Sequence, residues 1–137
     1  MQITRQADYA LRTILHLSRL GPGQRASTGQ IARDQNIPPS FLAKIVSQLS
    51  IAGVLQTWRG ARGGVSLALM PDNITLLEVV EAIDGPITFI GCVTDSSNCT
   101  FGEKCPLRPV WCDAHSEFIN RLKTTTFSQM AVTSTSD

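Results

Sequence analysis

The fold is decided by residues 27–69, which read STGQIARDQNIPPSFLAKIVSQLSIAGVLQTWRGARGGVSLAL. Ser27 and Gln30 have the spacing of a capping box, in which the two side chains satisfy unpaired N–H groups at the start of a helix. A short helix should therefore begin here. It should end before Pro38 and Pro39, because proline cannot continue a helix.

A second helix is expected from Ser40 to about Ala52, with Gly53 as its C-terminal cap. Its apolar side chains recur every three or four residues and should face the core. These side chains belong to Phe41, Leu42, Ile45, Val46 and Leu49. The two helices and the break between them form the outline of a helix-turn-helix.

Two short strand-like runs follow, Val54–Trp58 and Val65–Leu69, separated by a segment rich in glycine and arginine. Glycine can take the positive φ angles that a hairpin turn needs. An upstream helix over residues 5–20, the helix pair and this ribbon with a basic tip together outline a winged helix-turn-helix. We therefore predict a mainly α fold with a small two-stranded β-wing.

The rest of the chain contains two further helices and a segment without helical periodicity. Thr75 and Glu78 form a second capping box, which opens a helix to about Ile83. A long last helix should have Pro106 in its first turn. The predicted domains are a winged helix-turn-helix DNA-binding domain at 1–70, a connecting helix and cysteine-bearing loop at 71–105, a dimerisation helix with a short C-terminal helix at 106–130, and a disordered tail at 131–137.

Composition narrows the class of protein. The chain has 137 residues, of which 42% are apolar and 17% charged, as in ordinary globular proteins. It lacks an apolar run long enough to span a membrane and a signal peptide at the N-terminus, so a cytoplasmic protein is expected. No nucleophile–base pair, phosphate-cradling loop or pair of acids indicates an enzyme.

The net charge of +1 hides a gradient along the chain. Residues 1–70 carry eight Lys and Arg against two acids, a net of +6, and residues 71–137 carry a net of −5. A basic half can follow a polyanion such as DNA, and the acidic half should face a different partner.

The predicted recognition helix places Ser40, Lys44 and Gln48 on one stripe, away from most of its apolar face. Ser and Gln can hydrogen-bond base edges, and Lys can reach a phosphate or a guanine. Arginines at a wing tip suit a minor groove or the flanking phosphates. The predicted DNA-binding residues are Ser27, Thr28, Ser40, Lys44, Gln48, Arg59 and Arg62.

The cysteines are clustered, with Cys92, Cys99, Cys105 and Cys112 inside 21 residues. Cytosolic thiols are kept reduced, so a cluster of them indicates metal binding or redox chemistry rather than disulfides. Their spacing differs from the close C-x2-C pair of zinc ribbons. The spacing leaves the kind of metal open.

The last long helix carries a narrow apolar stripe at a spacing that suits a partner helix. We expect this stripe to form a dimer interface. Its residues are Leu107, Trp111, Ala114, Phe118 and Leu122.

The chain resembles the iron–sulfur winged-helix regulators of the IscR/NsrR type over roughly residues 1–130. The likeness rests on the opening with Asp8-Tyr9-Ala10 and on Ile31-Ala32, Phe41-Leu42-Ala43-Lys44-Ile45, Gln48-Leu49-Ser50-Ile51-Ala52-Gly53, Arg59-Gly60-Ala61-Arg62-Gly63-Gly64 and Cys92…Cys99…Cys105-Pro106-Leu107. The wing together with the three-cysteine segment is specific, whereas a helix-turn-helix alone would not be.

The resemblance implies a homodimer that regulates genes, usually by repression, through a palindromic operator. It implies a 4Fe-4S or 2Fe-2S cluster held by Cys92, Cys99 and Cys105, with nitric oxide, iron or cluster supply as the signal. In the nitric-oxide-sensing branch, a carboxylate matching Asp8 reaches the cluster from the partner subunit. Arg108 lies three residues after the third cysteine, where the IscR branch often has His, and cannot ligate iron. Cluster type and fourth ligand therefore stay open.

Two other functions are compatible with the residues. The cysteines could hold zinc or act as a thiol switch in a winged-helix regulator without a cluster, with His115 as a possible fourth zinc ligand. The chain could also be an iron–sulfur electron carrier or assembly partner, although the basic winged half would then have no purpose. Cys112 lies about two helical turns after Cys105 and is expected to be a buried thiol or a dimer contact. Asp8 could simply favour the helix dipole.

Overall fold

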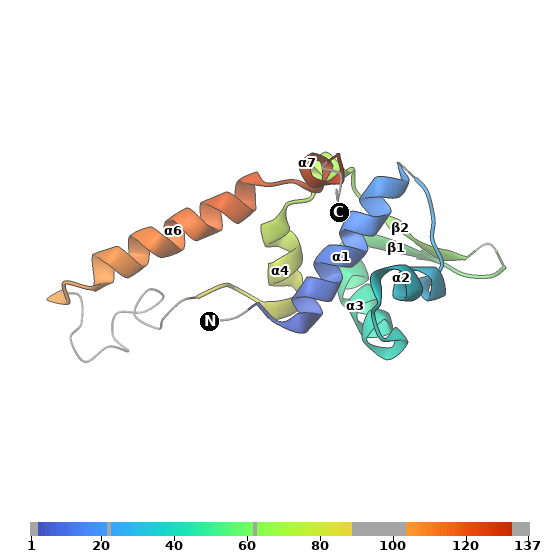
Figure 1. Cartoon of the computed structure of the whole chain (residues 1–137), viewed down its shortest axis with the longest axis horizontal. Helices are drawn as coiled ribbons and strands as arrows, with labels where there is room; N and C mark the ends of the chain where they lie inside the picture. The colour runs from blue at the N-terminus through green and yellow to red at the C-terminus, as the bar shows by residue number, and fades with distance from the viewer. Residues whose placement is uncertain (1–2, 22, 62, 89–103, 133–137) are drawn as a thin grey trace.

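The computed structural model describes residues 3–21, 23–61, 63–88 and 104–132. Its elements in chain order are α1 (Arg5–Leu20), α2 (Thr28–Gln35), α3 (Pro39–Ile51), β1 (Leu55–Trp58), β2 (Gly64–Leu67), the 3-10 helix η1 (Pro71–Asn73), α4 (Leu76–Asp84), α6 (Arg108–Thr124) and α7 (Phe127–Ala131). The predicted helical fold with a two-stranded wing is confirmed (Figure 1). Across the described ranges, the helices are too short or too polar to cross a membrane.

Local capping begins α2 where the sequence predicts, through the Ser27 half of the expected capping box. The Ser27 hydroxyl accepts a hydrogen bond from the Gln30 N–H at 3.1 Å and so begins α2. Asn36 ends this helix in the left-handed conformation, with a φ of 53°, which Asn tolerates better than most residues. The next N–H, of Ile37, then donates to the Ala32 carbonyl at 2.9 Å, and the chain turns into α3.

The end of α3 is closed by a glycine motif that starts the wing. Gly53 has a φ of 83° and donates its N–H to the Ser50 carbonyl at 3.1 Å, while Val54 donates to the Leu49 carbonyl at 3.0 Å. This pair of bonds is a Schellman motif. Of the five apolar side chains expected to face inward from this helix, four are buried, and Phe41 is 44% exposed. Its ring instead lies against Tyr9, so the inward prediction for Phe41 was wrong.

The wing is joined to the rest of the domain by an isolated β-bridge between Ala26 and Val65. Strands β1 and β2 pair antiparallel, with Trp58 opposite Gly64. The N–H of Ala26 donates to the Val65 carbonyl at 3.0 Å, and the Val65 N–H donates back at 2.8 Å. Gly64 has a φ of 143°, and a Cβ there would lie 2.6 Å from the Ala26 carbonyl oxygen. The loop before α2 can approach β2 this closely because Gly64 has no side chain.

Helix α1 is the centre of the core and packs against α2, α3, α4 and α7. Its inward residues Ala10 and Ile14 are fully buried, and Ile31 of α2 and Ile45 of α3 join them. Each large apolar side chain buried in this way contributes about 1.5–3 kcal/mol to stability. The core therefore holds the recognition helix from behind, and the opposite face of α3 remains at the surface.

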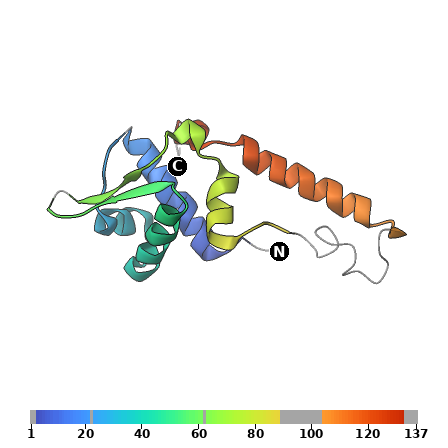
Figure 2. The ribbon, with the colours of Figure 1, turned by 180° about the vertical axis from the view of Figure 1, so that it is seen from behind.

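The C-terminal part leaves the winged domain and then returns to it (Figures 1 and 2). Helix α6 begins at Arg108, so Pro106 lies in the preceding turn and not in the first helical turn as predicted. After α6, the Phe127 N–H donates to the Ile74 carbonyl at 3.1 Å, and the Phe127 ring is completely buried beside α1. In the predicted tail, residue 131 ends α7, and residues 133–137 lie outside the described part of the chain.

Substituting Gly64 tests the close approach of the wing. Gly64→Ala should lower the free energy of unfolding by about 2–4 kcal/mol, because the new methyl group overlaps the Ala26 carbonyl and the φ is unfavourable for alanine. Gly29→Ala is the matched control, since Gly29 lies in α2 with space for a methyl group, and should raise stability by about 0.5–1 kcal/mol. Chemical denaturation followed by circular dichroism measures both. Equal stability of the two variants would contradict this account of the wing.

Candidate nucleic-acid interface and metal centre

The outer stripe of α3 presents two of its three predicted DNA-binding residues to solvent. Ser40 and Lys44 are exposed. Gln48 is half-buried, and its Oε1 atom is shielded from solvent and has no hydrogen-bond partner among the described residues. Because that acceptor points into the protein, Gln48 is a weaker candidate for reading a base edge than the sequence suggests.

The start of α2 lies beside this stripe in the helix-turn-helix. Ser27 and Thr28 are both exposed there. The Ser27 oxygen already accepts the capping bond from Gln30, so its hydroxyl remains a donor for a phosphate oxygen. Both residues therefore suit backbone contacts better than base reading.

The wing tip turns tightly because of its glycines. The Gly63 N–H donates to the Gly60 carbonyl at 2.9 Å, and a Cβ on Gly63 would lie 2.5 Å from the Trp58 carbonyl oxygen. Arg59 is exposed at this tip, whereas Arg62 lies outside the described residues. The tip, α2 and α3 all lie at the end of the molecule away from α6 (Figures 1 and 2).

The tip end of the wing strands contacts a basic residue that the sequence did not single out. The Arg25 guanidinium carbon lies 3.6 Å from the centroid of the Trp58 ring. The Trp58 indole N–H donates to the Ser66 hydroxyl at 2.9 Å, so Trp58 packs within the wing. No local pattern links Arg25 to Trp58, because their contact depends on the register of β1 with β2 and on the isolated bridge between Ala26 and Val65.

The structure describes only part of the predicted metal site. Cys92 and Cys99 lie outside the described residues, while Cys105 and Cys112 are half-buried thiols outside any disulfide. Within the described ranges, no three potential metal ligands come together. The predicted ligand set of Cys92, Cys99 and Cys105 therefore remains a prediction.

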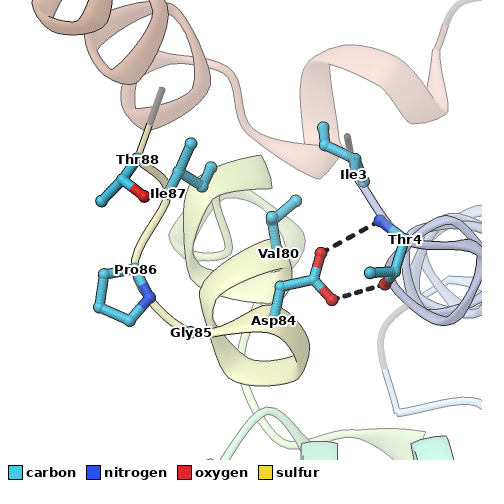
Figure 3. Close-up of a pocket in the computed structure, with 8 residues that line it drawn as sticks. All are labelled: Ile3, Thr4, Val80, Asp84, Gly85, Pro86, Ile87 and Thr88. Atoms are coloured by element: carbon cyan, nitrogen blue, oxygen red, sulfur yellow. Dashed lines mark hydrogen bonds between the residues drawn. The ribbon is translucent and has the colours of Figure 1, made fainter. Parts of the chain in front are cut away.

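The segment that carries these cysteines leaves from a point fixed by α1 and α6. The backbone N–H and the hydroxyl of Thr4, which caps α1, both donate to the carboxylate of Asp84 at the end of α4 (Figure 3). His115 of α6 donates its Nε2 proton to the Ile87 carbonyl at 2.7 Å. A zinc ion bound by His115 would have to use Nδ1 while this bond stands.

A pocket of about 200 Å³ lies at this junction. Figure 3 shows the Asp84 carboxylate turned toward Thr4 on one side of it. The lining residues are Ile3, Thr4, Val80, Asp84, Gly85, Pro86, Ile87 and Thr88. Both carboxylate oxygens are occupied by Thr4, so the pocket marks a structural joint rather than a ligand site.

Asp8 lies one turn into α1 from this joint. Its carboxylate accepts a hydrogen bond from the Arg12 Nε atom at 3.0 Å, and half of its side chain is exposed. Within one chain Asp8 thus forms an ordinary surface ion pair, and it is accessible to a second chain. Among the described residues, Asp8 belongs to no group of three or more potential metal ligands.

Helix α6 has no buried residue in the single chain. Along the predicted interface stripe, Leu107 is 61% exposed and Trp111 41% exposed, whereas Ala114, Phe118 and Leu122 are partly covered. A helix with large apolar side chains exposed along one face is typical of an interaction surface.

The family follows from comparison with known proteins. The model of the Rrf2 family, described as an iron-dependent transcriptional regulator, matches residues 3–133. The chain belongs to the Rrf2 family. It is 31% identical over 111 residues to the HTH-type transcriptional regulator NsrR of Bacillus subtilis, covering 80% of this chain and 76% of that protein. It is 28% identical over 131 residues to NsrR of Halalkalibacterium halodurans, covering 95% and 90%.

A solved structure agrees with this assignment. CymR, the global cysteine regulator of Bacillus subtilis, superposes with a TM-score of 0.83 at 27% identity and covers 96% of each chain. Rrf2 proteins are transcriptional regulators and not enzymes, so this Rrf2 protein is a DNA-binding regulator, as its winged helix-turn-helix predicts. The resemblance stated from its sequence motifs is confirmed.

Two substitutions in α3 test which side chains of this Rrf2 protein meet DNA. Lys44→Ala should weaken binding to duplex DNA about tenfold, because it removes an exposed cation from the recognition helix. Gln48→Ala should change affinity less than about twofold, since its amide oxygen is turned into the protein. Fluorescence anisotropy with a labelled duplex measures both, and a larger loss for Gln48→Ala would contradict the assigned interface.

Proposed function

We propose that this Rrf2-family protein is a repressor that binds a palindromic operator as a homodimer, with an iron–sulfur cluster controlling its affinity. The ligands would be Cys92, Cys99 and Cys105, with Asp8 of the partner subunit as a further ligand. The observation that carries the proposal is the position of the cysteines. They lie in and beside the one segment that joins α4 to α6, between a DNA-binding domain and a helix with exposed apolar side chains.

The donor set suits this cofactor by its chemistry. Three thiolates within 14 residues provide the soft ligands that iron–sulfur clusters require, and four ligands are usual. A carboxylate is a harder and more easily displaced fourth ligand than a thiolate. When bound, the cluster would supply iron that reacts with nitric oxide and that is lost when iron is scarce.

The chain can pass a change in this segment to the DNA-binding domain through two joints. The Asp84 carboxylate holds the N-terminus of α1 through Thr4, and the Ile87 carbonyl holds α6 through His115. Helix α1 packs directly on α3, the recognition helix. A change of conformation in the segment after Thr88 would therefore act on both the winged DNA-binding domain and α6.

Dimerisation follows from the exposed side of α6. Burying a large apolar side chain such as Leu107 or Trp111 removes it from water at a gain of about 1.5–3 kcal/mol. A second copy of α6 would cover the same stripe on both chains. The two winged domains would then face two half-sites, which is why a palindromic operator is expected.

A second candidate is a regulator whose cysteines hold zinc or switch by thiol chemistry without a cluster. It is supported by the similarity to CymR, which is named as the global cysteine regulator of its organism. An electron carrier is not favoured, because it would have no use for a winged DNA-binding domain and because the relatives are transcriptional regulators.

Anaerobic purification tests the cofactor. The wild type should be brown, with visible charge-transfer absorption and bound iron and sulfide, and Cys99→Ala should lose both the colour and the iron. Cys112→Ala is the matched control and should keep them, because Cys112 lies on α6 outside the proposed ligand set. A colourless wild type with bound zinc would favour the second candidate, and equal iron in Cys99→Ala would exclude Cys99 as a ligand.

Asp8 is tested through the response to nitric oxide. Asp8→Ala should bind iron yet show a changed visible spectrum and a changed rate of reaction with nitric oxide, because a displaceable ligand has been removed. Asp34→Ala is the control, since Asp34 is also a half-exposed acid near an α-helix end but lies in α2. Identical spectra and rates for wild type and Asp8→Ala would remove Asp8 from the site.

A further inference from the structure

We propose that Arg25, stacked on Trp58, is a preorganised contact for the phosphate backbone of duplex DNA, in addition to the residues predicted on α2, α3 and the wing tip. Arg25 is exposed, and its guanidinium carbon lies 3.6 Å from the centre of the indole ring. This distance is typical of a cation–π contact. Stacking uses the flat face of the guanidinium, and the five N–H donors lie in its plane.

The indole under Arg25 is itself held in place. Its N–H donates to the Ser66 hydroxyl at 2.9 Å, and Ser66 is only 3% exposed. Trp58 pairs with Gly64 across the two strands, so Ser66 is its diagonal neighbour on the same face of the ribbon. The ring therefore provides a fixed platform and not a mobile surface side chain.

The backbone that carries Arg25 is fixed by the same ribbon. Ala26 exchanges two hydrogen bonds with Val65, and its side chain is buried in the core. Neighbouring residues in an extended strand point to opposite faces. Arg25 therefore projects to the outer face, where Trp58 and Ser66 lie.

This position is well placed for DNA. Arg25 precedes the Ser27 cap of α2 by two residues and packs on Trp58 of β1, which leads into Arg59 at the wing tip. It thus lies next to both predicted contact regions, the start of α2 and the wing tip, in the half of the chain with a net charge of +6. Arginine matches the geometry of a phosphate with two parallel hydrogen bonds.

Stacking gives Arg25 an advantage over a freely moving cation. A long side chain loses conformational entropy when it is fixed by a partner. In Arg25 the ring restricts the side chain before DNA arrives, so binding costs less. Backbone contacts fix the register of a protein on DNA without reading sequence, and Arg25 would set the wing against the recognition helix in this way.

A salt titration tests the proposal with purified full-length protein in one cofactor state. The probes are a mixed-sequence DNA duplex and the operator recovered from a random-sequence library. Arg25→Gln should weaken binding to both probes by about fivefold. The slope of log affinity against log salt is negative, and the substitution should make it less steep by about one. Lys123→Gln is the control, because it removes one exposed charge from α6, and should leave both values near wild type.

Two further variants separate stacking from charge. Arg25→Lys keeps the charge but loses the planar stack, so it should recover less than half of the loss, in logarithmic units, caused by Arg25→Gln. Trp58→Phe keeps an aromatic face and should bind nearly as wild type, while Trp58→Leu should weaken binding as Arg25→Gln does. The double variant Arg25→Gln/Trp58→Leu should be no weaker than either single one, because both remove the same contact.

Two outcomes would overturn the proposal. One is an Arg25→Gln salt slope equal to that of Lys123→Gln, and the other is full wild-type affinity for Arg25→Lys. The inference rests on DNA binding and not on cluster control. If the affinity for DNA is the same with and without the cofactor but depends on Arg25, the proposed regulation is refuted and the proposed Arg25 contact is supported.

Discussion

The predicted DNA-binding surface, formed by α2, α3 and the wing, depends on two backbone hydrogen bonds between Ala26 and Val65. They attach the wing to the loop before α2 and so set the wing against the helix-turn-helix. A side chain at position 64 would prevent this approach, which explains the glycine there. The same pairing orients Arg25 toward Trp58. The relative positions of α2, α3 and the wing tip thus follow from one short stretch of strand pairing.

The other half of the chain has a different physical constraint, because helix α6 buries none of its residues in the single chain. Helix α6 projects from the winged domain with its C-terminal end toward that domain (Figure 1), and the chain after it buries Phe127 beside α1. The part of the chain between α4 and α7 is attached to the winged domain at both ends. Asp84 and Thr4 make the attachment at one end, and Phe127 makes it at the other. A change of geometry in α6 can therefore reach α1 from two directions.

Much of the fold could be predicted from sequence because its signals are local. The caps at Ser27 and Thr75 lie within three residues of the groups they satisfy, and they begin helices where expected. Long-range features gave no such signal. The contact of Arg25 with Trp58 depends on strand register, and the burial of Phe127 depends on the return of the chain after α6. Phe41 fits the helical period of α3 yet lies at the surface. Periodicity indicates which side of a helix is buried, but it does not show how far the buried side extends around the helix.

In the candidate site, too, the sequence indicates the chemistry of the side chains but not their long-range placement. Residue types and spacing were enough to select the cysteines and the exposed Lys44, but not to detect that the Gln48 amide oxygen is turned inward. The central claim is that the cysteine-bearing segment controls DNA binding. It is tested most directly by the operator affinity of one anaerobic sample before and after nitric oxide is added. The account predicts that affinity falls by tenfold or more, roughly the coupling found in allosteric proteins, and an unchanged affinity of an iron-loaded protein would contradict it.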